Sequence, residues 1–317
     1  MNPWQEFPWQ TGTPDPSRDR LCADTSDPRR PDCAIEGANF IRAPAASKDE
    51  IVVVAYNLQQ GRRLDDQLRA FQHESGMPTP DILLLSEADR GCTRTGNRNV
   101  AREYAEALGM CYVYGVEFVE LPRLFGPGGR VCRRCEHGNA IVSRYPLGNV
   151  EVIRHREARS WHSLPQRLLH VGEPRLGGRV ALSADVRVGE RLLRVYAVHF
   201  ESGRDADHYR IAQAQELIAD ASDLDYGAII AGDMNVGSYL GMKPGPDPEP
   251  ATSALLTAGY ADAHIGIDPH DRITTDSGVA IDLIFGRDVV FTDAGIGPRA
   301  IWGGLSDHLP VWARVRL

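Results

Sequence analysis

Residues 227–235 read Gly-Ala-Ile-Ile-Ala-Gly-Asp-Met-Asn, so an apolar run ends in the polar pair Asp233 and Asn235. Such a run of small and branched apolar residues is typical of a strand that is buried on both faces. Near the end of the chain, Asp307 and His308 stand just before another apolar run. Each pair joins a carboxylate to a second polar group, and such groups can contact a phosphate, a metal ion or a water molecule.

Polar residues occupy comparable positions in other apolar runs, at Asn57, Glu87, His199 and Asp282. A single polar residue at a strand end is usually a turn former. Six such positions in one chain, all of them Asn, Asp, Glu or His, instead favour a shared site. Asp282 is the sharpest case because burying a carboxylate costs several kcal/mol unless the group is paired. His308 is its natural partner.

The pattern of apolar runs predicts an α/β fold. Strands are expected at 51–56, 81–85, 112–119, 139–143, 147–153, 179–188, 192–198, 227–231, 280–285 and 309–315, and helices at 62–72, 99–108, 208–221 and 252–258. Buried strands, one hairpin and few helices predict two stacked mixed β-sheets flanked by helices. This arrangement is a four-layer α/β/β/α sandwich.

Residues 1–50 differ from the rest of the chain, since they hold seven prolines and nine acidic residues with little periodicity. This composition predicts an irregular N-terminal extension, followed by one folded domain over residues 51–317. Nowhere does the sequence contain a run of about 18 apolar residues, so we expect no transmembrane segment.

The formal net charge is −8, which excludes a globally basic clamp for nucleic acid. Positive charge nevertheless gathers in two stretches. Residues 122–137 carry four arginines against one glutamate, and residues 154–179 carry six arginines against two glutamates. Local basic surface on an acidic body suits an anionic substrate that is held at one site.

The six cysteines allow up to three disulfides. Cys22 and Cys33 lie in a Pro- and Asp-rich segment, where a small disulfide loop is expected. Cys132 and Cys135 have the spacing of a zinc knuckle or a redox pair, and we favour a local disulfide between them over free thiols or bound zinc. Disulfides imply an oxidising compartment, secreted or periplasmic. The first residues lack the pattern of a signal peptide, so removal of a signal and a cytoplasmic location both stay open.

Taken together, the motifs resemble the endonuclease/exonuclease/phosphatase superfamily, which has the DNase I-like fold. The resemblance covers about residues 51–317. It rests on Tyr56-Asn57, Ser86-Glu87, Gly138-Asn139-Ala140-Ile141-Val142-Ser143-Arg144, Ala197-Val198-His199-Phe200, Gly232-Asp233-Met234-Asn235, Ile281-Asp282-Leu283-Ile284-Phe285 and Ser306-Asp307-His308. One departure is Ser86, where many members have Gln, but the neighbouring Glu87 is kept.

The resemblance implies a metal-dependent phosphoesterase in which Glu87 is the main metal ligand. Asn57 completes or orients the coordination sphere of the metal ion, and Asp307 adds a carboxylate ligand. Oxygen ligands that leave room for several waters suit Mg²⁺ or Mn²⁺ better than Zn²⁺.

The resemblance also implies which residues perform the chemistry. Asp233 deprotonates or aligns the attacking water, and Asn235 fixes its geometry. His308, oriented by Asp282, donates to a phosphoryl oxygen or acts as an acid or base. His199 holds a second phosphoryl oxygen.

Two further residues are expected to contact the substrate. The family pattern places Asn139 beside the site, where it can bind phosphate, although Asn is also a common turn former at the start of a strand. Arg179 stands before an alternating strand and can reach a substrate anion.

The substrate class is open at this stage. We expect a nuclease-like phosphodiesterase that acts as a monomer and favours nucleic acid. A sphingomyelinase-like lipid enzyme or a small-molecule phosphoesterase is the alternative, but the only short apolar insertion that suits membrane docking is 121–125. A non-catalytic binding module is disfavoured because none of the Glu, Asp and His groups is missing.

Overall fold

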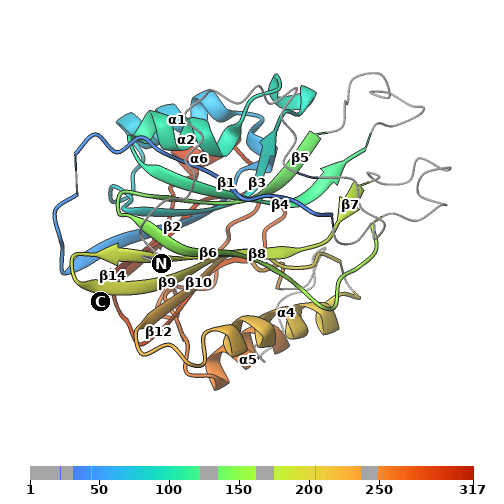
Figure 1. The fold of residues 1–317 in the computed structure, drawn as a ribbon. Helices are drawn as coiled ribbons and strands as arrows, with labels where there is room; N and C mark the ends of the chain where they lie inside the picture. Colours follow the sequence, from blue (N-terminus) through green and yellow to red (C-terminus); the bar gives the residue numbers. More distant parts are fainter. Residues whose placement is uncertain are drawn as a thin grey trace.

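The computed structural model describes residues 22, 31–43, 45–121, 135–161, 175–203, 205–236 and 249–317. Within these residues, two β-sheets pack face to face, and helices cover both outer faces (Figure 1). The predicted four-layer α/β/β/α sandwich is therefore confirmed.

The first sheet has the strand order β1-β4-β5-β3-β2-β14-β13, with β7 paired to β4. Its strands are β1 (Glu36–Asn39), β2 (Glu50–Asn57), β3 (Ile82–Arg90), β4 (Cys111–Glu120), β5 (Cys135–Ser143), β7 (Arg175–Gly177), β13 (Val290–Ile296) and β14 (Val311–Arg316). β2 and β3 are parallel and the other neighbours are antiparallel, so the sheet is mixed.

The second sheet has the strand order β11-β12-β10-β9-β8-β6. Its strands are β6 (Leu147–Arg154), β8 (Val180–Val188), β9 (Arg191–His199), β10 (Gly227–Asp233), β11 (Ala261–Asp262) and β12 (Asp282–Arg287). β9 and β10 are parallel, as expected for two buried apolar runs joined by a helix.

Helices α1 (Leu64–His73), α2 (Val100–Leu108) and α6 (Arg299–Trp302) lie on the first sheet, and α4 (Asp207–Asp220) and α5 (Pro250–Thr257) lie on the second (Figure 1). Two short 3₁₀ turns, η1 (Gln59–Gly61) and η2 (Thr93–Thr95), follow β2 and β3. The core between the sheets is mainly aliphatic, with Val, Ile, Leu and Ala from both inner faces. The polar residues Asn57, His199 and Asp233 are the last residues of the strands β2, β9 and β10.

The N-terminal segment contains a strand that its composition did not predict. β1 pairs with β4 at the edge of the first sheet. Glu36 of β1 is buried, and its Oε2 lies 2.6 Å from Nε of Arg90. A four-residue strand held by such tertiary contacts leaves no periodic signal, because its stability comes from partners distant in sequence. The division of the chain at residue 50 stays a prediction.

The structure contains the expected Cys22–Cys33 disulfide, but Cys135 pairs with Cys92. The expectation of a local Cys132–Cys135 disulfide was wrong. Strands β3 and β5 are antiparallel neighbours that bring Cys135 opposite the residues following Arg90, which sequence spacing alone does not reveal. Cys132 lies outside the described residues. No helix among the described residues is long and apolar enough to cross a membrane.

Candidate active site

Three neighbouring strands of the second sheet bring polar residues into one row. Asp233 at the end of β10 is in register with His199 at the end of β9 and with Asp282 at the start of β12. The residue before it is Gly232, with φ at +146°, and a Cβ there would lie 2.0 Å from the carbonyl oxygen of Val198. Only glycine fits such a close approach between strands, so Gly232 determines how β10 delivers Asp233.

The carboxylate of Asp233 is the centre of the site. Its Oδ2 accepts a hydrogen bond of 3.0 Å from Nδ2 of Asn57, and lies 3.5 Å from Nε2 of His199 and 3.8 Å from Nε2 of His308. Its Oδ1 accepts a hydrogen bond of 2.9 Å from the backbone N–H of Asn235. Four of the predicted site residues therefore converge on the carboxylate of a fifth, Asp233.

Burial sets the protonation of this carboxylate. Removal from water raises the pKa of Asp233 to about 7, with a further contribution from the negative charge of Asp282. The charge of His308 and the hydrogen bond from Asn57 act in the opposite direction. A carboxyl group with a pKa near neutrality is suited to accept a proton from water.

The predicted pairing of His308 with Asp282 is present. Nδ1 of His308 lies 2.8 Å from Oδ2 of Asp282. Although burial alone would lower it, the pKa of His308 rises to about 10 because Asp282, Asp233 and Asp307 surround the imidazole with negative charge. The ring is therefore cationic at neutral pH, and its Nε2 side is directed towards Asp233.

His199 has the opposite electrostatic character. Burial, followed by the positive charges of Arg179 and His137, holds its pKa well below the usual value. Its Nδ1 lies 3.9 Å from Oε2 of Glu117, a buried carboxylate of β4. The site thus combines a neutral imidazole and a cationic one on either side of Asp233.

The predicted metal side of the site is built by the ends of β2 and β3. Glu87 lies at a bulge of β3 with φ at +55°, and its Oε2 accepts a hydrogen bond of 2.5 Å from Nε2 of Gln60. Ser306 donates to the carbonyl oxygen of Asn57 at 2.8 Å, which joins the loop before β14 to the end of β2. The bulge redirects the Glu87 side chain relative to a regular strand.

The donor set fits a hard divalent cation. The pKa of Asp307 is raised by partial burial and also by the negative charge of Glu87, which places the two carboxylates within electrostatic reach of each other. Burial opposes ionisation of Glu87, but His137, His308 and Arg179 outweigh it, so its pKa is lowered. A cation between the two carboxylates relieves their repulsion, and carboxylate oxygens are the ligands that Mg²⁺ and Mn²⁺ prefer.

A second metal-capable group exists in the described part of the chain. One donor atom each from Asp233, Asp282 and His308 lies within 4.8 Å of the others. Nδ1 of His308 is already engaged with Asp282, so this group is better suited to proton transfer and phosphate contact than to ligating an ion.

The two residues predicted to contact the substrate, Asn139 and Arg179, are both engaged in contacts within the protein. Nδ2 of Asn139 donates to the carbonyl oxygen of Val180 at 2.9 Å and so joins the two sheets. Arg179 is buried, and its Nη1 lies 2.7 Å from Oε1 of Glu117. Contact of Asn139 and Arg179 with the substrate stays a prediction, and the structure adds a role for each in holding the site together.

Two residues near the site were missed by sequence reasoning. Glu117 interrupts the apolar run of β4, which is the same signal that singled out Asp282. His137 is buried in β5, and its Nδ1 lies 2.9 Å from Oδ1 of Asp89. A charge inside an apolar run could have identified Glu117, whereas His137 follows a stretch without any pattern.

Residues 54–308 match the Endonuclease/Exonuclease/phosphatase family. The chain belongs to this family. Members of the family hydrolyse phosphoester bonds with a divalent metal ion, and this protein is a metal-dependent phosphoesterase. No curated protein matches the chain significantly.

Solved structures of the family share the fold. An endonuclease/exonuclease/phosphatase from Beutenbergia cavernae DSM 12333 is 17% identical with a TM-score of 0.59, covering 85% of this chain and 72% of that one. D. rerio TDP2 complexed with single strand DNA product is 16% identical with a TM-score of 0.58, covering 85% and 100%. The human Nocturnin catalytic domain with bound sulfate anion is 17% identical with a TM-score of 0.52, covering 86% and 96%.

Proposed function

We propose that the protein is a Mg²⁺- or Mn²⁺-dependent phosphodiesterase that acts on nucleic acid by in-line attack of water. The observation that carries the proposal is the convergence of Asn57, His199 and His308 on the buried carboxylate of Asp233. A proton acceptor with two imidazoles beside it is the arrangement that phosphoryl transfer to water needs.

In this proposal, Asp233, His308 and His199 have different roles in the reaction. Asp233, with its pKa near 7, accepts the proton of the attacking water, while Asn57 and the backbone N–H of Asn235 hold the carboxylate in place. His308 remains cationic and stabilises the negative charge that develops on a phosphoryl oxygen. His199 contacts a second oxygen as a neutral imidazole.

The metal ion would be held by Glu87 and Asp307, with Asn57 orienting the sphere. When bound, it supplies positive charge to the phosphoryl oxygens and to the leaving oxygen. Both ends of the Asn57 amide are held in place, because its Nδ2 donates to Asp233 while its Oδ1 accepts from the backbone N–H of Gln59.

Nucleic acid is the preferred substrate because the catalytic groups suit a diester and because the similar D. rerio TDP2 structure contains a single strand DNA product. The test offers single-stranded DNA, plasmid DNA, RNA and sphingomyelin to the same preparation with Mg²⁺, and with chelator as a control. We expect metal-dependent cleavage of at least one nucleic acid. Cleavage of sphingomyelin alone would contradict the nucleic-acid assignment and favour a lipid enzyme.

The cellular location belongs to the same proposal. Two disulfides join cysteines of the described residues, and structural disulfides persist in oxidising compartments. We therefore place the protein outside the reducing cytoplasm, as a monomer. Sedimentation of the purified protein at a single mass near 34.9 kDa would support the monomer, and a concentration-dependent mass would contradict it.

A further inference from the structure

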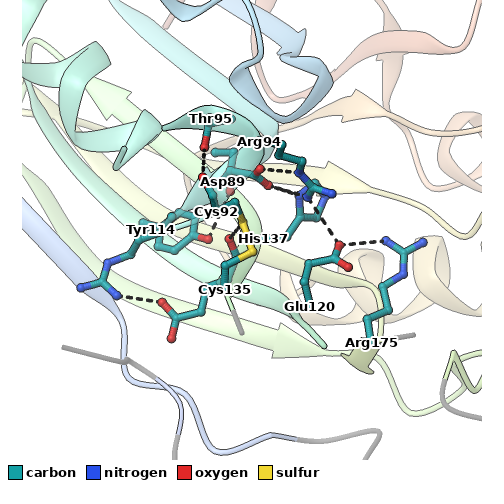
Figure 2. The surroundings of a disulfide bond; sticks show 12 residues. Asp89, Cys92, Arg94, Thr95, Tyr114, Glu120, Cys135, His137 and Arg175 are labelled. Atoms are coloured by element: carbon teal, nitrogen blue, oxygen red, sulfur yellow. Dashed lines mark hydrogen bonds and ion pairs between the residues drawn. A yellow bond between two sulfur atoms is a disulfide. The ribbon is translucent and has the colours of Figure 1, made fainter. Parts of the chain in front are cut away.

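A row of side chains leads away from the active site along the first sheet. Asp89 of β3 is in register with His137 of β5, and His137 is in register with Phe118 of β4. Two residues further along β4, Glu120 is in register with Arg175 of β7. Figure 2 shows the row from Asp89 through His137 and Glu120 to Arg175. It begins two residues after Glu87, so it extends the proposed metal side of the site.

Arg175 at the end of this row is held by two aromatic rings. Its guanidinium carbon lies 4.1 Å from the ring centroid of Phe118 and 4.2 Å from that of Trp161. The two rings meet edge to face, with their centroids 5.9 Å apart. Contacts of this kind fix the plane of a guanidinium and lower the entropy that it loses on binding a ligand.

The polar edge of Arg175 lacks matching acceptors. Among the described residues none accepts a hydrogen bond from it, and its Nε is buried without a partner. The carboxylate of the described residues that pairs with it is that of Glu120, whose Oε1 lies 3.9 Å from Nη1, which is too long for a hydrogen bond. The same oxygen lies 3.5 Å from Arg94, so its charge is shared between two arginines (Figure 2).

A guanidinium that is held by aromatic rings and has no hydrogen-bond acceptor in the described part of the chain is prepared for an anion. Its planar fork matches two oxygens of a phosphate, and an unsatisfied polar group in a largely buried position is costly until a ligand arrives. The Arg175 side chain is 14% exposed, so a ligand can reach it. Its charge contributes to the lowered pKa of Glu87 and of His199, so it lies within electrostatic reach of both halves of the site.

We propose that Arg175, clamped between Phe118 and Trp161, binds a second phosphate group of the substrate next to the phosphate that is cleaved. The inference rests on the proposed phosphodiesterase activity and narrows its substrate to esters with at least two phosphates. Two sources share this chemistry. The second phosphate is either the neighbouring diester of a nucleic-acid strand or the other half of a pyrophosphate linkage.

The test compares three substrates with wild type, Arg175→Gln and Arg175→Lys. Dithymidine monophosphate has one phosphate, trithymidine diphosphate has two separated by a sugar, and a dinucleoside pyrophosphate has two sharing an oxygen. The measured quantity is the preference of each protein, defined as kcat/KM for a two-phosphate substrate divided by kcat/KM for the one-phosphate substrate. We expect Arg175→Gln to lower this preference about tenfold, mainly through a higher KM, because a charge-assisted bidentate contact is lost. The preference of Arg175→Lys should lie between those of wild type and Arg175→Gln, because lysine keeps the charge but lacks the planar guanidinium.

A matched control is Arg314→Gln, which removes the same charge from a half-exposed arginine of β14 that lies 3.8 Å from Asp293. This variant should leave the substrate ratio unchanged. If Arg175→Gln loses kcat/KM on trithymidine diphosphate alone, the second phosphate belongs to a nucleic-acid strand. If it loses kcat/KM on the dinucleoside pyrophosphate alone, the second phosphate belongs to a pyrophosphate linkage. An equal loss on all three substrates with a lower Tm would overturn the proposal, because Arg175 would then only brace the two rings.

A binding measurement separates this inference from the proposed function. Calorimetric titration with inorganic pyrophosphate and with inorganic phosphate, in the presence of chelator, needs no turnover. Tighter binding of pyrophosphate by wild type than by Arg175→Gln supports the subsite even if no substrate is hydrolysed. Equal binding by the two proteins would overturn it, even if the enzyme proves to be a phosphodiesterase.

Discussion

Asp233 occupies a position that is unfavourable for a charged carboxylate. Its pKa is raised from 3.8 to about 7, so the native protein holds this proton more tightly than the unfolded chain does. Stability therefore falls as the pH rises from about 4 towards 7, and above pH 7 the ionised group weakens the fold. We predict that Asp233→Asn raises the free energy of unfolding at pH 8 by at least about 1 kcal/mol, since one pKa unit corresponds to about 1.4 kcal/mol.

Urea unfolding in the presence of chelator measures this effect. The difference between Asp233→Asn and wild type should shrink at pH 5, where Asp233 is already protonated in the native state. The same substitution should lower kcat by about 10²- to 10⁴-fold, the usual contribution of a positioned proton acceptor. A variant that is both less stable than wild type at pH 8 and fully active would contradict this role of Asp233.

The charge of His308 is expected to determine how kcat declines at alkaline pH. Its pKa of about 10 depends above all on Asp282, so the cation is present below pH 10 and is lost as the pH rises through that value. In Asp282→Asn the pKa of His308 should fall, and the alkaline decline of kcat should move to lower pH by at least about one unit. The pH–rate profiles of the two proteins test this shift. An unchanged alkaline limb would show that His308 does not titrate in the reaction.

At the residue scale, the sequence allowed site residues to be predicted where burial of a polar group without a partner would cost free energy. Asp282 within an apolar run demanded a partner, and the structure supplies His308 at 2.8 Å. Arg175 could not be found in this way, because its significance comes from Phe118 and Trp161, which lie 57 and 14 residues away in the chain. Contacts between distant positions leave no trace in local patterns.

At the scale of elements, the pairing of β3 with β5 controls the metal side of the site. Glu87 lies at the bulge of β3, and the Cys92–Cys135 disulfide joins the two strands just beyond it. We predict that the double variant Cys92→Ser/Cys135→Ser loses about 2–4 kcal/mol of stability and needs more Mg²⁺ for half-maximal activity. Thermal unfolding and a Mg²⁺ titration of the rate measure the two effects.

The double variant Cys22→Ser/Cys33→Ser is the matched control. It removes a disulfide with a sequence separation of only 11, in the N-terminal segment and outside the paired strands β3 and β5. This variant should lose stability but keep the Mg²⁺ requirement of wild type. If both double variants changed the Mg²⁺ requirement equally, the strand pairing would have no special role in metal binding.

Buried strands inside a sheet were predictable, but β1 and β13 at the edges of the first sheet were not. The apolar runs of β2, β3 and β10 gave both the type of element and its polar end. β13 has an exposed, mixed composition, and β1 has only four residues. Their pairing with β14 and β4 depends on neighbours that are already folded, so tertiary context decides them.

At the scale of the whole molecule, the disulfides decide the redox state. The sequence holds six cysteines, and the described residues account for two disulfides and the buried free Cys111. We predict that protein purified without reductant shows at most two thiols when titrated under denaturing conditions. Six thiols would contradict the disulfides and with them the proposed oxidising compartment.

The overall architecture followed from composition and strand order, because two sets of buried strands with few helices have few ways to pack. The basic stretch at 122–137 lies largely outside the described residues, whereas five of the six arginines of the stretch at 154–179 are described. The predicted role of both stretches in holding an anionic substrate stays a prediction. Within the described residues, the positive charges that act on Glu87 include His308 and Arg175, and Arg175 belongs to the second basic stretch.

In the proposed mechanism, Asp233 and a divalent ion together hydrolyse a phosphodiester. The most direct measurement is the rate of hydrolysis of bis(p-nitrophenyl) phosphate by wild type and Asp233→Ala, each with Mg²⁺ and with chelator. We expect a rate for wild type with Mg²⁺ that disappears on chelation and returns when the ion is restored, and none above background for Asp233→Ala. Hydrolysis by Asp233→Ala at the wild-type rate, or a wild-type rate that chelator does not affect, would contradict the account.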